Sequence, residues 1–206
     1  ETLVYADCPG GTLLSDGTAD VLCQMELPRG YVHKFGGHVH QGHALELHSS
    51  SQVGQYSYLP KWVFFDNGTI GIWLGASGKL QMLTNDPLRG WPIRGPGTTT
   101  RGTSHVHTAL WRLDFDLGGF PGDALEQLDF KGSGSLMRDM VLSQVTKEAV
   151  LLADPMQLRT WRVLDTALTN ADGHAISYEL YPETSQTHRG PATEPWTLAD
   201  LYLTTY

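Results

Sequence analysis

The sequence predicts an all-β protein, a large antiparallel β-sandwich, from three observations. Gly (23) and Pro (11) are frequent among the 206 residues, which supplies many turns. Only 17% of the residues are charged, fewer than long amphipathic helices need. Runs rich in β-branched and aromatic residues recur at short spacing between turn residues. The length suffices for a sizeable core, and we expect a single domain over residues 1–206.

Charge and hydropathy exclude two classes of partner. The 14 Lys and Arg against 22 Asp and Glu give a net charge of −8, so we expect no nucleic-acid binding. No run of about 18 apolar residues occurs, so we expect no transmembrane helix. The first residue is Glu1, with neither an initiator Met nor a signal-peptide pattern, so we expect a processed, excised or incompletely represented chain.

The first element is a loop closed by the two cysteines. Turn residues separate Cys8 from Cys23, so the two thiols could meet. A disulfide there would contribute about 3 kcal/mol and would favour an oxidising compartment, hence a secreted or periplasmic protein. Two buried free thiols are the alternative.

A hairpin follows at residues 62–74. Two β-rich runs, 62–65 and 70–74, flank Asn67-Gly68, which supplies the positive φ angles of a type I′ turn. Asn67 also begins a glycosylation sequon, but the turn explains it better.

Residues 104–116 alternate between two faces, which predicts a long strand. His105 and His107 share one face and could hold copper or zinc with a third ligand. Alternatively, one imidazole packs in a core and the other faces water.

The remaining elements are assigned from composition. We expect loops over 84–103, 117–135 and 182–195, a helix or strands over 137–152, strands over 159–164, 176–181 and 198–206, and a turn at 170–173.

Two further groups could bind metal. Five histidines lie between His33 and His48, and His38, His40 and His43 stand on an expected loop, where a solvated loop is the favoured interpretation. Asp114, Asp116 and the Phe115 carbonyl offer oxygen ligands of the kind that calcium takes, although exposed acids are the simpler interpretation.

Four stretches, in order, resemble the C-terminal β-sandwich domain of the copper-containing amine oxidases. They are Val53-Gly54-Gln55-Tyr56-Ser57-Tyr58 with residues 62–70; His105-Val106-His107 with Arg112-Leu113-Asp114-Phe115-Asp116; Arg159-Thr160-Trp161-Arg162 with Gly173-His174 and Tyr178-Glu179-Leu180; and Leu201-Tyr202-Leu203-Thr204-Thr205-Tyr206.

The resemblance implies a catalytic site. Tyr56 falls on the tyrosine that becomes topaquinone, and His105 and His107 fall on two of three copper ligands. Asp114, Phe115 and Asp116 fall on a peripheral calcium site. The implied reaction is oxidative deamination of a small-molecule primary amine to an aldehyde, with peroxide and ammonia, in a homodimer.

The chain departs from the family pattern at several points. Gln55 replaces an asparagine and Ser57 an acidic residue, and the third copper histidine and the catalytic aspartate fall outside residues 1–206. Three interpretations remain open. A missing segment or a second chain completes an amine oxidase; the protein is a diverged metal-dependent enzyme that uses His105 and His107, with or without the loop histidines, and an unmodified Tyr56; or it is a non-catalytic binding or structural sandwich.

Overall fold

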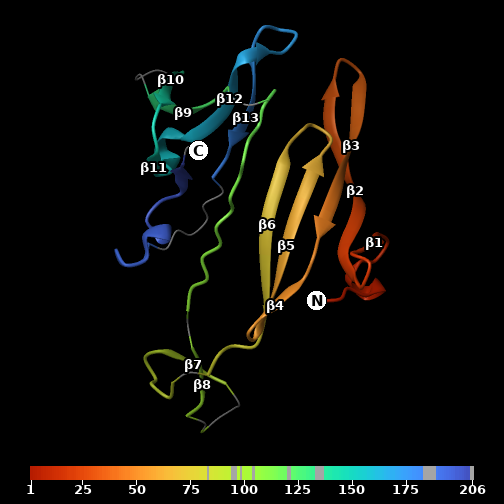
Figure 1. Ribbon diagram of the computed structural model, residues 1–206, viewed down its shortest axis with the longest axis vertical. Coiled ribbons are helices and arrows are strands. Elements are labelled where there is room, and N and C mark those ends of the chain that lie inside the picture. Colours follow the sequence, from red (N-terminus) through yellow and green to blue (C-terminus); the bar gives the residue numbers. More distant parts are fainter. Residues whose placement is uncertain are drawn as a thin grey trace. The chain divides into compact units, whose positions relative to one another are not determined.

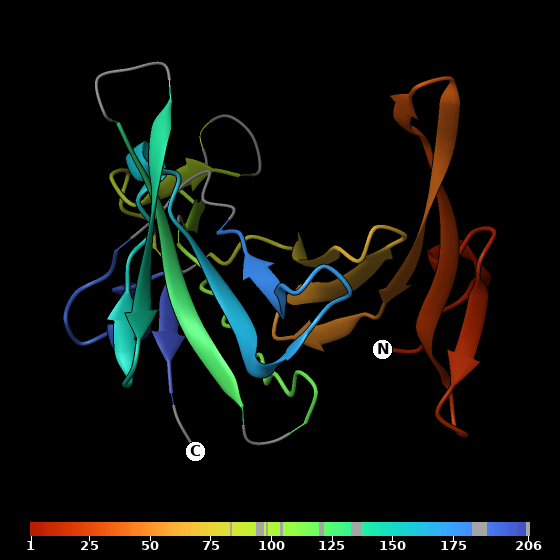
Figure 2. The same ribbon diagram turned by 90° about the horizontal axis from the view of Figure 1, so that it is seen from above.

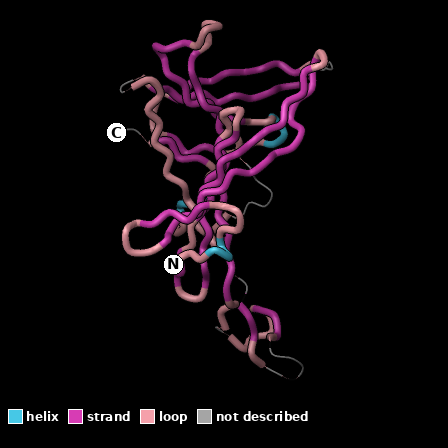
Figure 3. The backbone as a smooth tube through the Cα atoms, turned by 90° about the vertical axis from the view of Figure 1, so that its right-hand side faces the viewer, coloured by secondary structure: helices cyan, strands magenta, loops and turns pink. Residues whose placement is uncertain are grey.

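The computed structural model describes residues 1–82, 84–93, 97, 99–103, 105–119, 122–132, 137–182 and 189–204. These residues form antiparallel strands and three short 3-10 helices, as Figure 3 shows in magenta and cyan. The all-β, antiparallel fold class is therefore confirmed. The chain divides into two compact units, Glu1–His107 and Thr108–Tyr206, and the single domain stays a prediction.

The first unit is built on a six-stranded antiparallel sheet (Figure 1). Its strands are β1 (Thr12–Ser15), β2 (Asp20–Phe35), β3 (His38–His48), β4 (Ser51–Val53), β5 (Tyr56–Phe65) and β6 (Ile70–Gly78). Strand β5 is central: β3 and β4 pair with successive parts of it, and β6 pairs with nearly its whole length. Two further short strands, β7 (Gly90–Pro92) and β8 (Arg101–Thr103), pair within the region expected to be a loop.

The hairpin of β5 and β6 confirms the prediction, but its turn differs from the one expected. Of Asn67 and Gly68, only Gly68 has a positive φ, +84°. The Gly68 amide donates to the Phe65 carbonyl at 3.0 Å, and the Phe65 amide donates to the Thr69 carbonyl at 2.9 Å. This is a three-residue loop ending in a glycine bulge, which needs one positive φ where a type I′ turn needs two.

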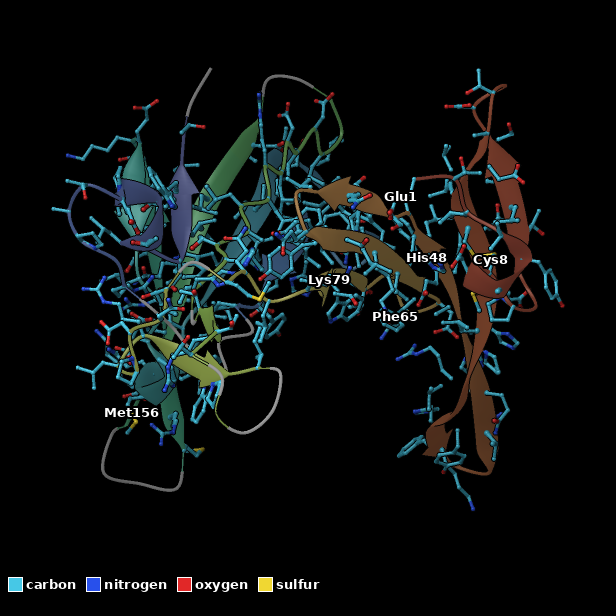
Figure 4. The ribbon with its side chains drawn as sticks, turned by 90° about the horizontal axis from the view of Figure 1, so that it is seen from below. Glu1, Cys8, His48, Phe65, Lys79 and Met156 are labelled. Atoms are coloured by element: carbon cyan, nitrogen blue, oxygen red, sulfur yellow. A yellow bond between two sulfur atoms is a disulfide. The ribbon has the colours of Figure 1, made fainter. Side chains whose placement is uncertain are left out.

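The predicted disulfide between Cys8 and Cys23 is present, and it anchors the N-terminal segment to β2. Both cysteines are buried beside Leu3. The imidazole of His48, at the end of β3, bonds to the Asp7 carbonyl at 3.0 Å through Nε2 (Figure 4). Helix η1 (Tyr5–Asp7) is thereby attached to the sheet through a covalent and a polar contact.

The histidines expected on a loop lie on a strand instead. Residues His38, His40 and His43 belong to β3, which pairs with β2 as a long hairpin (Figure 2, red to orange). The loop itself consists of Gly36 and Gly37, with φ of +54° and +87°. The prediction was wrong because glycines on both sides of the histidines are typical of a loop. They interrupt the alternating pattern by which a strand such as β3 is identified in a sequence.

The second unit contains a four-stranded antiparallel sheet of order β10-β9-β12-β13 and a pair, β11 with β14. The bounds are β9 (Asp123–Gly132), β10 (Arg138–Val145), β11 (Ala149–Leu151), β12 (Thr160–Thr169), β13 (Ala175–Leu180) and β14 (Leu201–Leu203), with helices η2 (Pro155–Gln157) and η3 (Pro195–Thr197). The strands expected over 159–164 and 176–181 are thus found. Of the strand expected over 198–206, the structure forms Leu201–Leu203, and residues 205–206 lie outside the described part of the chain. For residues 137–152, strands replace the alternative of a helix, as the β-branched residues of this segment favour.

Strand β9 corrects the expectation of a loop over 117–135. Its charged residues are typical of an exposed loop, but Glu126 and Asp129 are buried in the strand. They can be buried because Arg162 and Arg159 neutralise their charges. Arg159 binds the Asp129 carboxylate through two nitrogens, at 2.7 and 3.1 Å, and this contact lowers the pKa of Asp129. The core beside these pairs is centred on Trp161, which is 2% exposed.

The long strand expected over 104–116 is not formed. Residues 105–116 have no ladder partner among the described residues, although Figure 1 shows them as an extended green trace. Alternation predicts an extended backbone with two faces, but a strand also needs a neighbouring strand. Within the described part of the chain, no helix has the length and hydropathy of a membrane span.

Candidate metal and tyrosine site

Tyr56 and Tyr58 stand on one face of β5, because side chains two positions apart on a strand point the same way. Each backbone is fixed on both edges. Tyr56 pairs with Val53 of β4 and Gly78 of β6, and Tyr58 pairs with Ser51 and Ala76. Gly78 has no room for a side chain, since a Cβ there would lie 2.2 Å from the Gln55 carbonyl oxygen. The two phenols are therefore held by a rigid, closely packed part of the sheet.

His105 meets Tyr56 through a defined nitrogen. The His105 Nδ1 lies 2.9 Å from the Thr103 carbonyl, which can only accept, so Nδ1 carries the proton. The other nitrogen, Nε2, then has a lone pair and accepts from the Tyr56 hydroxyl at 2.9 Å. The ring nitrogen of His105 that carries the lone pair therefore points at the phenol oxygen.

His107 pairs with the second tyrosine. Its Nδ1 lies 2.5 Å from the Tyr58 hydroxyl oxygen. The two imidazole rings are 4.7 Å apart between centroids, and the Tyr56 ring is 5.6 Å from His105 and 4.8 Å from His107. Two imidazoles and two phenols thus form one cluster, and the expected shared orientation of His105 and His107 is realised without a strand.

A cavity of about 340 Å³ opens beside this cluster. Tyr56 and both histidines line it, and Leu80 and Trp91 give it an apolar side. The site is therefore open to a small molecule from within this unit.

The donors of the cluster suit copper. Imidazole nitrogens combined with an oxygen donor are ligands that Cu(II) accepts. Among the described residues, no three His, Cys, Asp or Glu side chains are grouped as a metal site requires. The chain thus offers two imidazoles and the phenol oxygens, a partial donor set that fits copper.

The residues expected to bind calcium lie in the second unit. Phe115 packs towards the core, with its ring 6.2 Å from that of Tyr178, while Asp114 and Asp116 on either side of it are exposed. The two carboxylates therefore reach solvent from one short segment, and calcium binding there stays a prediction.

His40 and His43 of the long hairpin contact carboxylates. Asp66 accepts from the His43 amide at 2.9 Å, from His40 Nε2 at 3.2 Å and from Arg29 at 2.7 Å. These bonds, the His43 amide first, lower the pKa of Asp66 to about 2. His43 Nδ1 lies 3.0 Å from Glu26. In the described residues these side chains do not join His105 or His107 in a metal-binding group. The interpretation in which His38, His40 or His43 adds a ligand to His105 and His107 therefore receives no support.

Two contributors to the site were not identified from the sequence. Thr103 acts through its backbone carbonyl, which no side-chain pattern reveals. Tyr58 could have been found, because its position two residues after Tyr56 places it on the same face of any strand.

The sequence of the chain matches a family model described as copper amine oxidase, enzyme domain, over residues 18–202. A primary amine oxidase of Klebsiella aerogenes is 32% identical over 157 residues, which are 67% of this chain and 20% of that protein. The chain thus spans about a fifth of the length of this relative.

Two solved structures share the fold. The lysyl oxidase of Pichia pastoris superposes with a TM-score of 0.75 at 20% identity, over 100% of this chain and 33% of that one. An amine oxidase of Aspergillus nidulans superposes with a TM-score of 0.66 at 22% identity, over 96% of this chain and 30% of that one. Since the family model covers most of the sequence, the chain belongs to the copper amine oxidase family and carries part of its enzyme domain.

Proposed function

We propose that this chain forms part of a copper-dependent primary-amine oxidase, in which His105 and His107 hold copper and Tyr56 is the precursor of topaquinone. The supporting observation is the bond of 2.9 Å between the Tyr56 hydroxyl and His105 Nε2, the nitrogen whose lone pair would bind the metal in place of this hydrogen bond. A metal ion at that nitrogen would lie next to the phenol to be oxidised.

Several residues of this chain have separate roles in the proposed site. Thr103 fixes the tautomer of His105, and β5 fixes the position of the Tyr56 ring. Copper and the quinone would supply the electron sink for oxidation of a primary amine by O₂ and water to an aldehyde, peroxide and ammonia. Leu80 and Trp91 would shield one side of the cavity from water.

The rest of the assembly belongs to the same proposal. The third copper ligand and the catalytic base would come from a further segment or a second chain, and the enzyme would be a homodimer. Asp114, Asp116 and the Phe115 carbonyl would bind a structural calcium ion. The disulfide between Cys8 and Cys23 supports a secreted or periplasmic location.

The test is the chemical state of Tyr56. After reconstitution of the complete enzyme with Cu(II) in air, including the segment or chain that supplies the third ligand, we expect a coloured protein that reacts with phenylhydrazine, and a Tyr56 peptide whose mass differs from that of the unmodified sequence. The Tyr56→Phe variant, which retains both imidazoles, is the matched control and should bind copper but remain colourless. An unmodified Tyr56 peptide in copper-loaded wild-type protein would contradict topaquinone chemistry.

A second candidate is favoured by Gln55 and Ser57, which replace the residues that flank the quinone tyrosine in the family pattern. In that case the protein is a diverged metal-dependent enzyme with an intact Tyr56. Stoichiometric copper together with an unmodified Tyr56 peptide would identify it. A wild-type protein that takes up neither copper nor zinc would indicate a binding or structural role.

A further inference from the structure

Tyr58 lies on the same strand face as Tyr56 but contacts the other imidazole. Its hydroxyl oxygen is 2.5 Å from His107 Nδ1, and the two ring centroids are 5.8 Å apart. We infer that Tyr58 is a positioning residue for copper binding: it holds His107 at Nδ1 and so presents Nε2 of that ring to the metal. This inference rests on the proposed function, in which His107 is a ligand.

The two Tyr–His pairs use different ring nitrogens. In His105 the nitrogen facing Tyr56 is Nε2, because Nδ1 is bound to the Thr103 carbonyl. In His107 the nitrogen facing the tyrosine is Nδ1, and no hydrogen bond from the described residues reaches Nε2. In each imidazole Nδ1 is thus bound, to Thr103 or to Tyr58, and Nε2 is the nitrogen that would bind the metal, in His105 in place of the hydrogen bond from Tyr56.

The chemistry of a ligating imidazole explains why the Nδ1 partner matters. When a metal takes the lone pair on Nε2, Nδ1 keeps its proton and needs an acceptor. The Tyr58 oxygen has lone pairs to accept it. Such a partner fixes the tautomer and orientation of the ring and makes the ligand more basic, and its loss lowers metal affinity about 10- to 100-fold.

The place of Tyr58 in the sheet fixes the position of its backbone, as a residue that orients His107 requires. Its backbone is paired on both edges, with Ser51 and Ala76, and its side chain is half-buried. His107 lies on an exposed segment without a ladder partner in the described part of the chain. The sheet therefore provides, through Tyr58, a fixed partner for a ring whose own backbone has no ladder pairing among the described residues.

The test compares Tyr58→Phe with Tyr31→Phe, which removes a hydroxyl from an exposed tyrosine of the long hairpin. Dissociation constants for Cu(II) and Zn(II) are measured by competition with a chelator on each folded variant. We expect Tyr58→Phe to weaken binding about 10- to 100-fold and Tyr31→Phe to leave it unchanged. In the zinc-loaded wild type, ¹⁵N NMR of the His107 ring should show a protonated Nδ1 and a metal-bound Nε2, with altered signals in Tyr58→Phe.

The outcomes separate this inference from the proposed function. If wild type and Tyr58→Phe bind copper equally and the His107 signals agree, Tyr58 does not position the ligand, although the metal site stands. A tyrosinate-to-copper charge-transfer band that persists in Tyr56→Phe and disappears in Tyr58→Phe would make Tyr58 a ligand and overturn the positioning role. Absence of metal uptake by the wild type would overturn the metal site itself, and this inference with it.

Discussion

Single hydrogen bonds determine what His105 can do. The Thr103 carbonyl selects the tautomer whose Nε2 carries the lone pair, and this lone pair accepts the hydrogen bond from Tyr56. The orientation of the His105 ring thus depends on a backbone atom, the Thr103 carbonyl oxygen, and not on the Thr103 side chain.

The first prediction concerns His105 itself. We expect His105→Ala to abolish copper uptake, because a single remaining imidazole is too few ligands for a stable site. Equilibrium dialysis followed by elemental analysis measures the bound copper. His33→Ala, which removes an exposed imidazole of the long hairpin, should bind copper as the wild type does. Equal uptake by both variants would place the copper elsewhere.

The second prediction concerns the ion pair between half-buried Arg159 and buried Asp129. Replacing Arg159 by Met leaves a buried carboxylate without its main partner, which should lower the free energy of unfolding by about 2 to 3 kcal/mol at pH 7. Urea titration measures the loss. Arg138→Met, on an exposed position of β10, should be nearly neutral.

The pH dependence of the same pair follows from the direction of the pKa shift. The folded-state pKa of Asp129 lies below its ordinary value of 3.8, so its contribution is complete above that value and is lost as the pH falls below it. The Arg159→Met variant should therefore lose less stability on acidification than the wild type. An equal acid response in both proteins would contradict the assignment.

At the scale of elements, the long hairpin of β2 and β3 is tied to the turn after β5 by Asp66. Arg29 from β2 binds this carboxylate and also lies over the Phe65 ring, 4.5 Å from its centroid. Three elements thus meet at one carboxylate, and the histidines around it serve this junction.

The third prediction follows from the lowered pKa of Asp66, about 2. Because this value lies below 3.8, the junction is fully stabilised above about pH 4 and weakens as the pH falls towards 2. In Asp66→Asn, the amide proton of His43 should exchange faster than in the wild type at neutral pH. Hydrogen-exchange NMR measures this, with Asp139→Asn on β10 as the control. Unchanged protection of the His43 amide would show that Asp66 does not hold the hairpin.

The fourth prediction concerns the disulfide. It closes a loop of 15 positions, so its reduction should lower the free energy of unfolding by about 3 kcal/mol through the greater freedom of the unfolded chain. Urea titration of the oxidised protein and of a Cys8→Ala, Cys23→Ala double variant measures the difference. Equal midpoints would mean that packing around Leu3 suffices to hold the segment.

At the scale of the whole molecule, the sequence predicts best what depends on neighbours along the chain. The β5–β6 hairpin, the disulfide and the shared orientation of His105 and His107 follow from turns and alternation. The ladder of residues 104–116 and strand β9 were assigned wrongly, because both depend on distant partners: a neighbouring strand in one case, and Arg159 and Arg162 in the other. Tyr58 was missed because its role depends on which residue lies opposite.

The fifth prediction is association. Large apolar side chains are strongly exposed among the described residues, such as Leu88 at 92%, Phe35 at 78% and Trp91 at 72%. Packing against a second copy of the chain would remove such side chains from water. We expect sedimentation equilibrium to give about twice the mass of the single chain. A monomer at all concentrations would contradict self-association of the chain.

The pairing of β11 with β14 has a consequence for biosynthesis. Residues Ala149–Leu151 bind Leu201–Leu203, which leave the ribosome much later. At about 5–20 residues per second, β11 waits several seconds with an open edge while the intervening polypeptide is translated. The nascent protein therefore exposes an unpaired strand edge at β11 during this interval, where a co-translational chaperone could bind.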